Sequence, residues 1–371
     1  MKKTKLINAF FFLVAGALSL SGCTSGSTNQ NTAEADNEAA ASPENTMKTE
    51  IKVVSSEDDK KVDILIGDEL FTSYIYPDDL EKPVLYPIVA AGDLKVTRGF
   101  PRDPRPGERV DHPHHVGYWF NYGDVNGLDF WNNSYNIPAE KKEKYGSIVH
   151  TEVKKTVSGE VGELEVAMDW LKPDGTKLLQ EDTKFTFSAS GNKRIIDRVT
   201  TLTATEEEVL FKDNKEGVLG IRMTRALELP SDKPEIFTDA SGIASEVPVL
   251  NNEGVTGDYL NSEGITGNDA WGKRAVWCKL HGEMDGNPVA VVIIDHPQNP
   301  GYPTHWHSRG YGLFAANPLG QKVFSEGELE LNLKLQPGES ATFRYRVIVH
   351  SKSELSADEL DQEAAEFGGV L

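Results

Sequence analysis

The chain of 371 residues is 38% hydrophobic and contains 38 Lys and Arg against 58 Asp and Glu, which gives a formal net charge of -20. A chain this acidic is repelled by nucleic-acid phosphates, which argues against general DNA or RNA binding. Its two cysteines exclude a disulfide-rich scaffold and a cysteine-built zinc or iron–sulfur site.

Residues 1–22 have the pattern of a lipoprotein signal peptide. Lysines at positions 2, 3 and 5 precede a mostly apolar run over 6–20, which is too short for a comfortable membrane span. The run ends in LSGC at 20–23, which resembles a bacterial lipobox. We therefore expect cleavage before Cys23, lipidation of Cys23, and a membrane-anchored protein in the periplasm or on the cell surface. A plain secretory signal followed by a chance cysteine is the alternative.

The next segment, 23–50, is rich in Ser, Thr, Asn, Ala and Glu and has almost no large apolar side chain. Such a composition cannot offset the entropy of ordering, so it predicts a flexible linker between the lipid and a domain over 51–371. Cys278 lies in a strand-like run and is expected to be a small core residue.

The domain shows the period-two alternation of β-strands. Leucine, valine, methionine and tryptophan alternate with polar residues over 164–170, and two further alternating runs, 329–335 and 343–349, flank a Pro-Gly turn and predict a hairpin. The apolar run 289–294 predicts a strand covered on both sides. A capping box, Ser356 with Glu359, starts a short C-terminal helix that ends near Phe367. We predict an all-β fold, a large antiparallel β-sandwich with this helix.

Two segments, 98–131 and 295–318, are dense in histidine, aromatic, Pro and Gly residues and are typical of functional loops. If 304–308 is extended, His305 and His307 share one face and Trp306 points into the core. A third cluster, 212–217, places alternating charges at a strand entry, and a solvated turn is its alternative explanation.

These residues permit a definable chemistry. Imidazole gives or takes a proton near neutrality, and a nearby carboxylate can orient it or act as its opposite partner. Aromatic faces flanked by Asn, Asp and Arg suit a sugar-sized polyol. The spacings His112-x-His114 and His305-x-His307 also suit zinc, copper or iron, so a metal-dependent enzyme remains an alternative, as do purely structural histidines.

Several strings together resemble the bacterial family often labelled "PmoA-like" or methane oxygenase PmoA. They are DHPHH at 111–115, GDVNG at 123–127 followed by DFW at 129–131, KEG at 215–217, HP at 296–297, THWH at 304–307 and AANP at 315–318. The resemblance covers roughly 51–350. Val116 departs from the family pattern, in which arginine follows the two histidines, so the ligand specificity of this chain can differ. No membrane-spanning run follows the signal, which argues against methane oxidation.

The resemblance implies a β-supersandwich similar to galactose mutarotase-like proteins, and a carbohydrate ligand. On this basis we expect acid–base chemistry on a sugar or polyol, with a non-catalytic glycan-binding lipoprotein as the alternative. The expected catalytic residues are His115, His307, Glu216 and Asp213. The expected ligand-binding residues, with Tyr118 and Trp131 as stacking platforms and no metal assigned, are Arg98, His114, Tyr118, Asp124, Asn126, Trp131, Lys215, Arg222, His305, Arg309 and Asn317.

Overall fold

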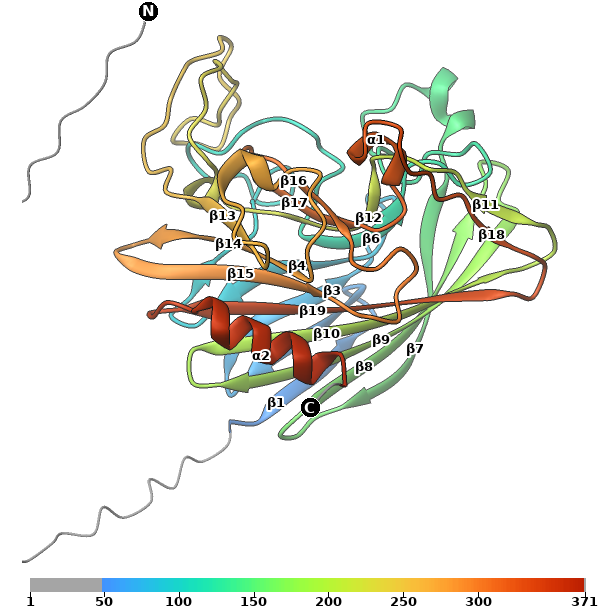
Figure 1. Cartoon of the computed structure of the whole chain (residues 1–371), viewed down its shortest axis with the longest axis horizontal. Coiled ribbons are helices and arrows are strands. Elements are labelled where there is room, and N and C mark those ends of the chain that lie inside the picture. Colours follow the sequence, from blue (N-terminus) through green and yellow to red (C-terminus); the bar gives the residue numbers. More distant parts are fainter. Residues whose placement is uncertain (1–48, 370–371) are drawn as a thin grey trace, which may run out of the picture. The chain divides into compact units, whose positions relative to one another are not determined.

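The computed structural model describes residues 49–369. The predicted signal peptide, the predicted lipidation site Cys23 and most of the predicted linker lie outside the described residues. Within the described range, strands form two large antiparallel sheets and one small sheet (Figure 1). The nine-stranded sheet has the order β1 (Ile51–Ser56), β2 (Lys61–Ile66), β3 (Glu69–Ile75), β4 (Val84–Ala90), β6 (Tyr118–Tyr122), β12 (Gly217–Arg222), β17 (Leu313–Asn317) and β16 (His305–Ser308), with β5 (Leu94–Lys95) attached to β4.

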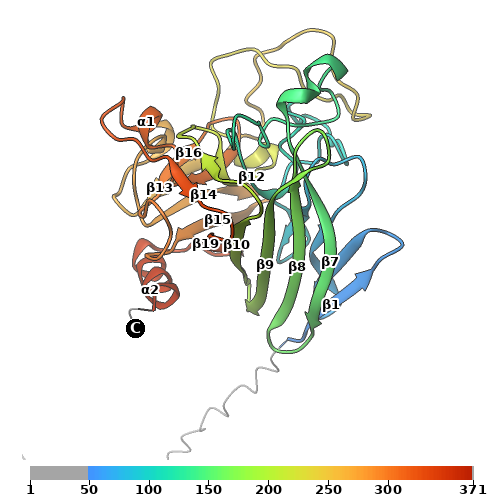
Figure 2. The ribbon, with the colours of Figure 1, turned by 90° about the vertical axis from the view of Figure 1, so that its right-hand side faces the viewer.

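The second sheet contains the longest strands, which lie side by side in Figure 2. Its order is β13 (Asp258–Asn261), β14 (Trp277–Met284), β15 (Asn287–Asp295), β19 (Ser340–Ser351), β10 (Lys193–Ala204), β9 (Lys177–Ser190), β8 (Gly162–Leu171) and β7 (Ser147–Val157). The small sheet pairs β11 (Val209–Phe211) with β18 (Leu333–Leu335). The helical segments of the described residues are α1 (Gln321–Phe324), α2 (Ala357–Phe367) and the 3-10 turns η1 (Ala139–Lys144), η2 (Arg225–Leu227) and η3 (Gly267–Ala270).

One hydrophobic core lies between the two large sheets. The alternation predicted over 164–170 is confirmed, because the four apolar side chains of β8 are at most 3% exposed and join a core that also contains Val62 and Phe71 of the other sheet. At one edge, Ile51 N donates to Gly159 O (2.7 Å), which brings β1 beside the turn between β7 and β8. The predicted antiparallel β-sandwich with a short C-terminal helix is therefore confirmed.

The strand predicted over 289–294 is β15, and it is covered on both faces as expected. Val291 packs into the main core, whereas Val292 packs with Leu360 of α2 on the opposite face. Helix α2 begins with the predicted capping box, in which the Ser356 hydroxyl accepts from Glu359 N and the Glu359 carboxylate accepts from Ser356 N. Figure 1 shows α2 lying across this outer face.

The predicted hairpin over 329–349 is wrong. Only Leu333–Leu335 of its first run form a strand, and this strand, β18, pairs with β11. The second run belongs to β19, which pairs with β10 and β15 in the centre of the eight-stranded sheet. The reason is that β19 finds a longer partner on each side, whereas Leu329 before β18 stays 43% exposed.

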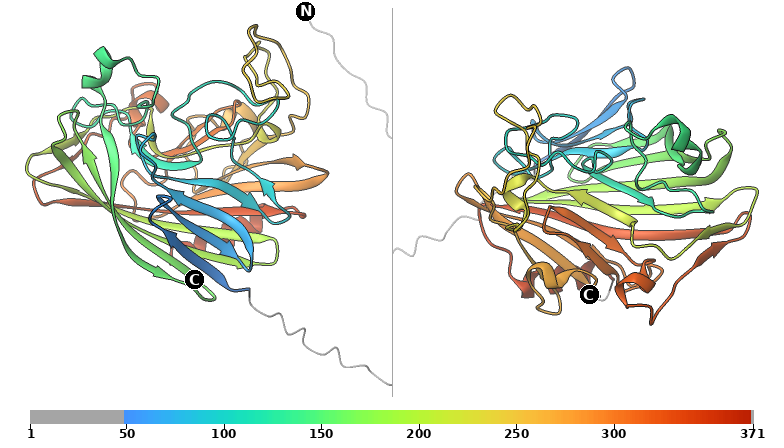
Figure 3. Two further views of the ribbon diagram at one scale, coloured as in Figure 1. Left: turned by 180° about the vertical axis from the view of Figure 1, so that it is seen from behind. Right: turned by 90° about the horizontal axis from the view of Figure 1, so that it is seen from above.

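Loops cover the outer face of the nine-stranded sheet at its β6–β12–β17–β16 end, as Figure 1 and the view from above in Figure 3 show. Beneath them, a small apolar cluster on this face contains Val116, Trp119, Trp131, Leu313 and Ala315. The histidine-rich segments are thus partly strand, because 98–131 contains β6 and 295–318 contains β16 and β17. In residues 49–369, no helix is long and apolar enough to cross a membrane.

Candidate functional site

A row of four paired residues crosses the outer face of this sheet end. Trp119 on β6 is opposite Gly220 on β12, Gly220 is opposite Ala315 on β17, and Ala315 is opposite His307 on β16. The two small residues leave room between the large ones, since a Cβ on Gly220 would lie 2.5 Å from the Trp119 indole. Three strand spacings, roughly 14 Å, separate the ends of the row.

The two predicted strand histidines lie next to each other on β16. His305 and His307 are 3% and 1% exposed, and Trp306 between them packs into the main core, as the extended segment predicted. His305 Nδ1 lies 2.8 Å from Gly272 O, and because a carbonyl only accepts, the proton is on Nδ1 and Nε2 is a bare acceptor. The Phe324 ring lies over both imidazoles, with centroid distances of 5.4 and 5.8 Å.

Four aromatic rings stack on one another beside the loop that precedes β6. Tyr311 lies on His112 (5.1 Å, 4°), His112 on His115 (4.9 Å, 3°) and His115 on Trp119 (5.1 Å, 13°). His114 meets His115 edge to face at 4.3 Å. The stack lies at the Trp119 end of the row, and His307 lies at the other end.

A buried arginine pair fixes this loop. The Asp111 carboxylate accepts from Arg98 and from Arg222 Nη2 (2.7 Å), and together with its contact to His112 this holds the pKa of Asp111 well below its usual value although burial alone would raise it. Arg98 also donates to the carbonyls of His112 (3.0 Å) and His115 (3.2 Å). The structure therefore makes Arg98 a positioning residue for the loop, whereas we expected it to hold ligand.

Arg222 determines the tautomer of His115. Its Nη1 lies 3.4 Å from His115 Nδ1, and since guanidinium only donates, His115 carries its proton on Nε2. The face thus presents an N–H donor from His115 and a bare nitrogen acceptor from His305. A hydroxyl group can satisfy both kinds of nitrogen.

Glu216 brings a carboxylate to the other end of the row. Its Oε2 lies 3.8 Å from His307 Nδ1, and its other oxygen contacts the Lys215 ammonium. Burial, followed by the positive charges of Arg309 and Lys215, lowers the pKa of His307 to about 3, and a contact with the Lys215 backbone acts in the opposite direction. His307 is therefore neutral near pH 7 and polarised by a neighbouring carboxylate.

The imidazoles at both ends are buried and uncharged. Burial first, then Lys82, lowers the pKa of His114 to about 2, and burial also holds the pKa of His115 well below its usual value. Most of the buried ring nitrogens without a hydrogen-bond partner among the described residues lie here: His114 Nε2, His115 Nε2, Trp119 Nε1, Trp271 Nε1, His305 Nε2, and Nδ1 and Nε2 of His307. The exception is His350 Nδ1, on β19 of the other sheet. Buried polar atoms are almost always satisfied, so this concentration indicates a ligand site.

One small cavity, about 10 Å³ in volume, reaches this cluster at His114, and a larger one lies beside it. The small cavity is lined by Lys82, His114 and Asn133, whose Oδ1 is also buried without a partner among the described residues. The other has a volume of about 340 Å³ and is lined by Arg309 and by Tyr311, the outermost ring of the stack.

Six predicted residues have other surroundings. Tyr118 points to the opposite face of β6 into the main core and Trp131 is 1% exposed, so neither offers an open stacking platform. Asp213, Asn317, Asp124 and Asn126 use their side chains on nearby backbone: Asp213 accepts from Lys322 N and Leu331 N, Asn317 from Gly320 N, Asp124 from Gly127 N, and Asn126 from Leu210 N.

Sequence reasoning missed Lys82, Phe324, Tyr311 and the ring of Trp271. Lys82 is 5% exposed, donates to His114 O (2.9 Å) and lies 5.7 Å from the Trp119 ring centroid. Trp271 lies under the Arg309 guanidinium at 5.0 Å. Tyr311 lies in the segment 295–318 that its composition had marked, but its role in the ring stack was not predicted. No local pattern marked Lys82, Trp271 or Phe324 of α1, because only the tertiary structure brings them to the site.

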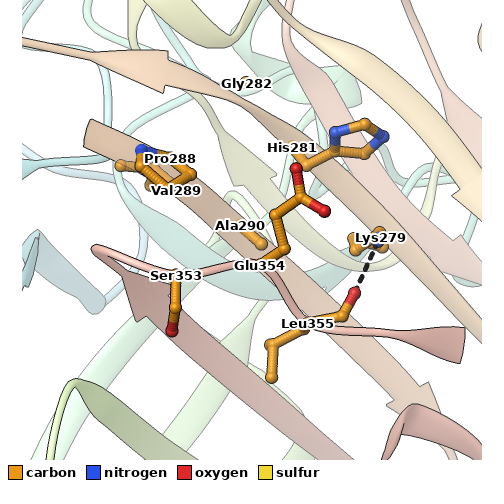
Figure 4. Close-up of a pocket in the computed structure, with 9 residues that line it drawn as sticks. All are labelled: Lys279, His281, Gly282, Pro288, Val289, Ala290, Ser353, Glu354 and Leu355. Atoms are coloured by element: carbon orange, nitrogen blue, oxygen red, sulfur yellow. Dashed lines mark hydrogen bonds between the residues drawn. The ribbon is translucent and has the colours of Figure 1, made fainter. Parts of the chain in front are cut away.

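A third cavity, about 120 Å³ in volume, lies on the other sheet beside the start of α2 (Figure 4). Lys279, His281 and Glu354 line it, but the Lys279 ammonium already donates to Leu355 O (2.9 Å). Among the described residues, none that lines this cavity has a buried polar atom without a partner. The histidine cluster is therefore the stronger candidate site.

The histidine spacings also left a metal site open. Among residues 49–369, no three His, Cys, Asp or Glu side chains converge as ligands for a metal ion.

The protein is therefore an antiparallel β-sandwich that carries buried histidines on the outer face of one sheet. The chain belongs to a family of unknown function, DUF6807, whose model matches residues 61–365. No curated protein matches it.

Solved structures similar to this chain include the galactosidase domain of alpha-galactosidase-sucrose kinase AgaSK, with 11% identity, a TM-score of 0.39, and coverage of 81% of this chain and 41% of that one. The GH36 alpha-galactosidase AgaA from Geobacillus stearothermophilus has 11% identity, a TM-score of 0.36, and coverage of 82% and 41%. A galactose mutarotase-like protein from Clostridium acetobutylicum has 11% identity, a TM-score of 0.35, and coverage of 82% and 98%. The chain spans about two fifths of the two galactosidase chains, and likenesses this distant carry no argument about activity.

Proposed function

We propose that this protein is a membrane-anchored lipoprotein that binds a sugar or related polyol at the histidine cluster and performs acid–base chemistry on it. The observation that carries the proposal is the set of buried, uncharged ring nitrogens on and beside one sheet face that have no hydrogen-bond partner among residues 49–369. A hydroxylated molecule can donate to the bare nitrogens and accept from the N–H groups, which an apolar ligand cannot do.

The proposed chemistry uses His307 and Glu216. A neutral imidazole 3.8 Å from a carboxylate can take a proton from a substrate hydroxyl or carbon acid, since the carboxylate stabilises the imidazolium that forms. His115 at the other end of the face supplies an N–H that can stabilise negative charge developing on a substrate oxygen. Epimerisation, elimination and hydrolysis of a sugar all require a proton transfer of this kind.

The test compares three forms of the full chain on a panel of mono- and oligosaccharides, with products followed by chromatography. His307→Ala should lose about 10²–10⁴-fold in turnover while its melting temperature stays near that of the unchanged chain. The matched control is His281→Ala, because His281 lines the cavity on the other sheet. Loss of turnover in His281→Ala with normal turnover in His307→Ala would overturn the proposed site.

Sugar binding without turnover would lead to a different conclusion. If sugars raise the melting temperature and His307→Ala weakens that effect, but long incubations give no product, the chain binds glycans without catalysis. In that case the binding part of the proposal stands and the acid–base part is wrong.

A further inference from the structure

The positive charges around the histidine cluster outnumber the carboxylates that contact them. Five cationic side chains act on its imidazoles, namely Lys82, Arg98, Lys215, Arg222 and Arg309. Asp111 is shared between Arg98 and Arg222, and Glu216 pairs with Lys215. Of these five cations, Lys82 and Arg309 have no carboxylate within ion-pair distance among residues 49–369, which stands out in a chain whose formal net charge is -20.

Lys82 contributes a buried ammonium with a single hydrogen bond. It is 5% exposed and donates to His114 O, and in the described part of the chain no carboxylate lies within ion-pair distance of its Nζ. Glu81 and Asp129 act on it only through space. A buried charge is normally paired, because removing it from water is costly. Lys82 therefore adds positive charge without a carboxylate in ion-pair contact to this end of the site, as far as residues 49–369 show.

Arg309 contributes a guanidinium at the opposite end, where a cavity reaches the surface. It lies over Trp271, its Nε is buried without a partner, and it forms no ion pair with the described residues. Elsewhere in the cavity wall, Glu235 pairs with Arg109 at 2.9 Å, and Asp232 and Lys233 are both exposed. Among the described residues that line this cavity, Arg309 is thus the cation that is partly buried and has no carboxylate within ion-pair distance.

We propose that the ligand of the histidine cluster is an acidic sugar whose carboxylate binds to the Arg309 guanidinium, within a field that Lys82 strengthens from the far end of the site. This inference rests on the proposed function and narrows its substrate class from polyols in general to uronic acids. A planar guanidinium holds a carboxylate through two parallel hydrogen bonds, whereas a neutral sugar would leave the surplus charge unpaired.

The experiment measures binding of two matched pairs, glucuronate with glucose and galacturonate with galactose, by calorimetry and by thermal shift. At least one uronate should bind about tenfold or more tightly than its neutral partner, and its affinity should fall as salt is added. Arg309→Gln should weaken uronate binding by about 10- to 100-fold and should weaken neutral-sugar binding by a much smaller factor. The matched control is Arg344→Gln, since Arg344 lies on β19 of the other sheet.

Lys82→Met gives a second readout that a structural role would not produce. It should weaken uronate binding without lowering the melting temperature, because methionine fills a similar space and removes an unpaired buried charge. A large drop in melting temperature with unchanged uronate affinity would make Lys82 a structural residue and remove it from the inference.

The remaining outcomes separate this inference from the proposed function. Equal or tighter binding of the neutral sugars, or unchanged uronate affinity in Arg309→Gln, overturns the carboxylate inference and leaves the proposed function standing. If neither uronates nor neutral sugars bind the full chain, both are overturned.

Discussion

Glu216 Oε2 and His307 Nδ1 lie 3.8 Å apart on the outer face of the nine-stranded sheet, although the two residues are far apart in the chain. Glu216 precedes β12 and His307 is on β16, with β17 between these strands. The imidazole is almost fully buried, and Glu216 supplies the carboxylate within ion-pair distance of it among the described residues, while burial, Arg309 and Lys215 lower its pKa. This contact joins two clusters that the sequence presents as separate.

Glu216→Gln should lower turnover on an identified substrate by about 10²-fold, because the amide cannot stabilise a charged His307. Glutamine has nearly the same shape, so the melting temperature should change little. Steady-state kinetics give the first quantity and calorimetry the second. Glu330→Gln, which removes an exposed carboxylate beside Lys322, is the control, and wild-type turnover in Glu216→Gln would remove the carboxylate from the mechanism.

Stability should depend on pH through His307. Its pKa is about 3 in the folded chain and near 6.5 when exposed, so between these values the unfolded chain binds the additional proton. The contribution of the neutral imidazole is therefore complete above pH 6.5 and is lost as pH falls toward 3, at up to about 1.4 kcal/mol per pH unit.

The measurement for this prediction is chemical denaturation of the unchanged chain and of His307→Asn across the same pH range. The difference in unfolding free energy between the two should be constant above pH 6.5. Below pH 6.5 the unchanged chain should lose stability relative to the variant. A difference that stays constant down to pH 3 would show that His307 titrates in the folded chain as it does in water.

Asp111→Asn should lower the unfolding free energy by about 3–5 kcal/mol, because it leaves two buried guanidinium groups with a neutral partner. Urea denaturation measures the effect. Asp68→Asn tests the same chemical change at an exposed ion pair with Lys52 and should have no measurable effect. Equal effects of the two substitutions would mean that Asp111 does not hold the histidine loop.

Ser356→Ala should cost about 1 kcal/mol of unfolding free energy, because it removes the N-cap of the helix that covers β15. Glu359→Ala removes the reciprocal hydrogen bond of the same box, so the double variant should lose less than the sum of the two single losses. Full additivity in denaturation experiments would contradict a coupled capping box.

Local patterns were sufficient where one stretch of chain decides its own structure. The burial of β8 and β15, the same-face placement of His305 and His307, and the cap of α2 all follow from periodicity or from a four-residue motif. The partner of β19 did not follow, because strand pairing depends on which distant strand offers the longer apolar face.

The candidate site divides in the same way. Residue type and spacing pointed to the histidine-rich segments that contain His115 and His307, and the family resemblance added Glu216. The same reasoning predicted Tyr118 as a ligand contact. Successive side chains of a strand point to opposite faces, however, and Tyr118 of β6 points into the core. The unpaired charges of Lys82 and Arg309 became visible only in three dimensions, because a missing partner is a property of everything that surrounds a side chain and of no single segment.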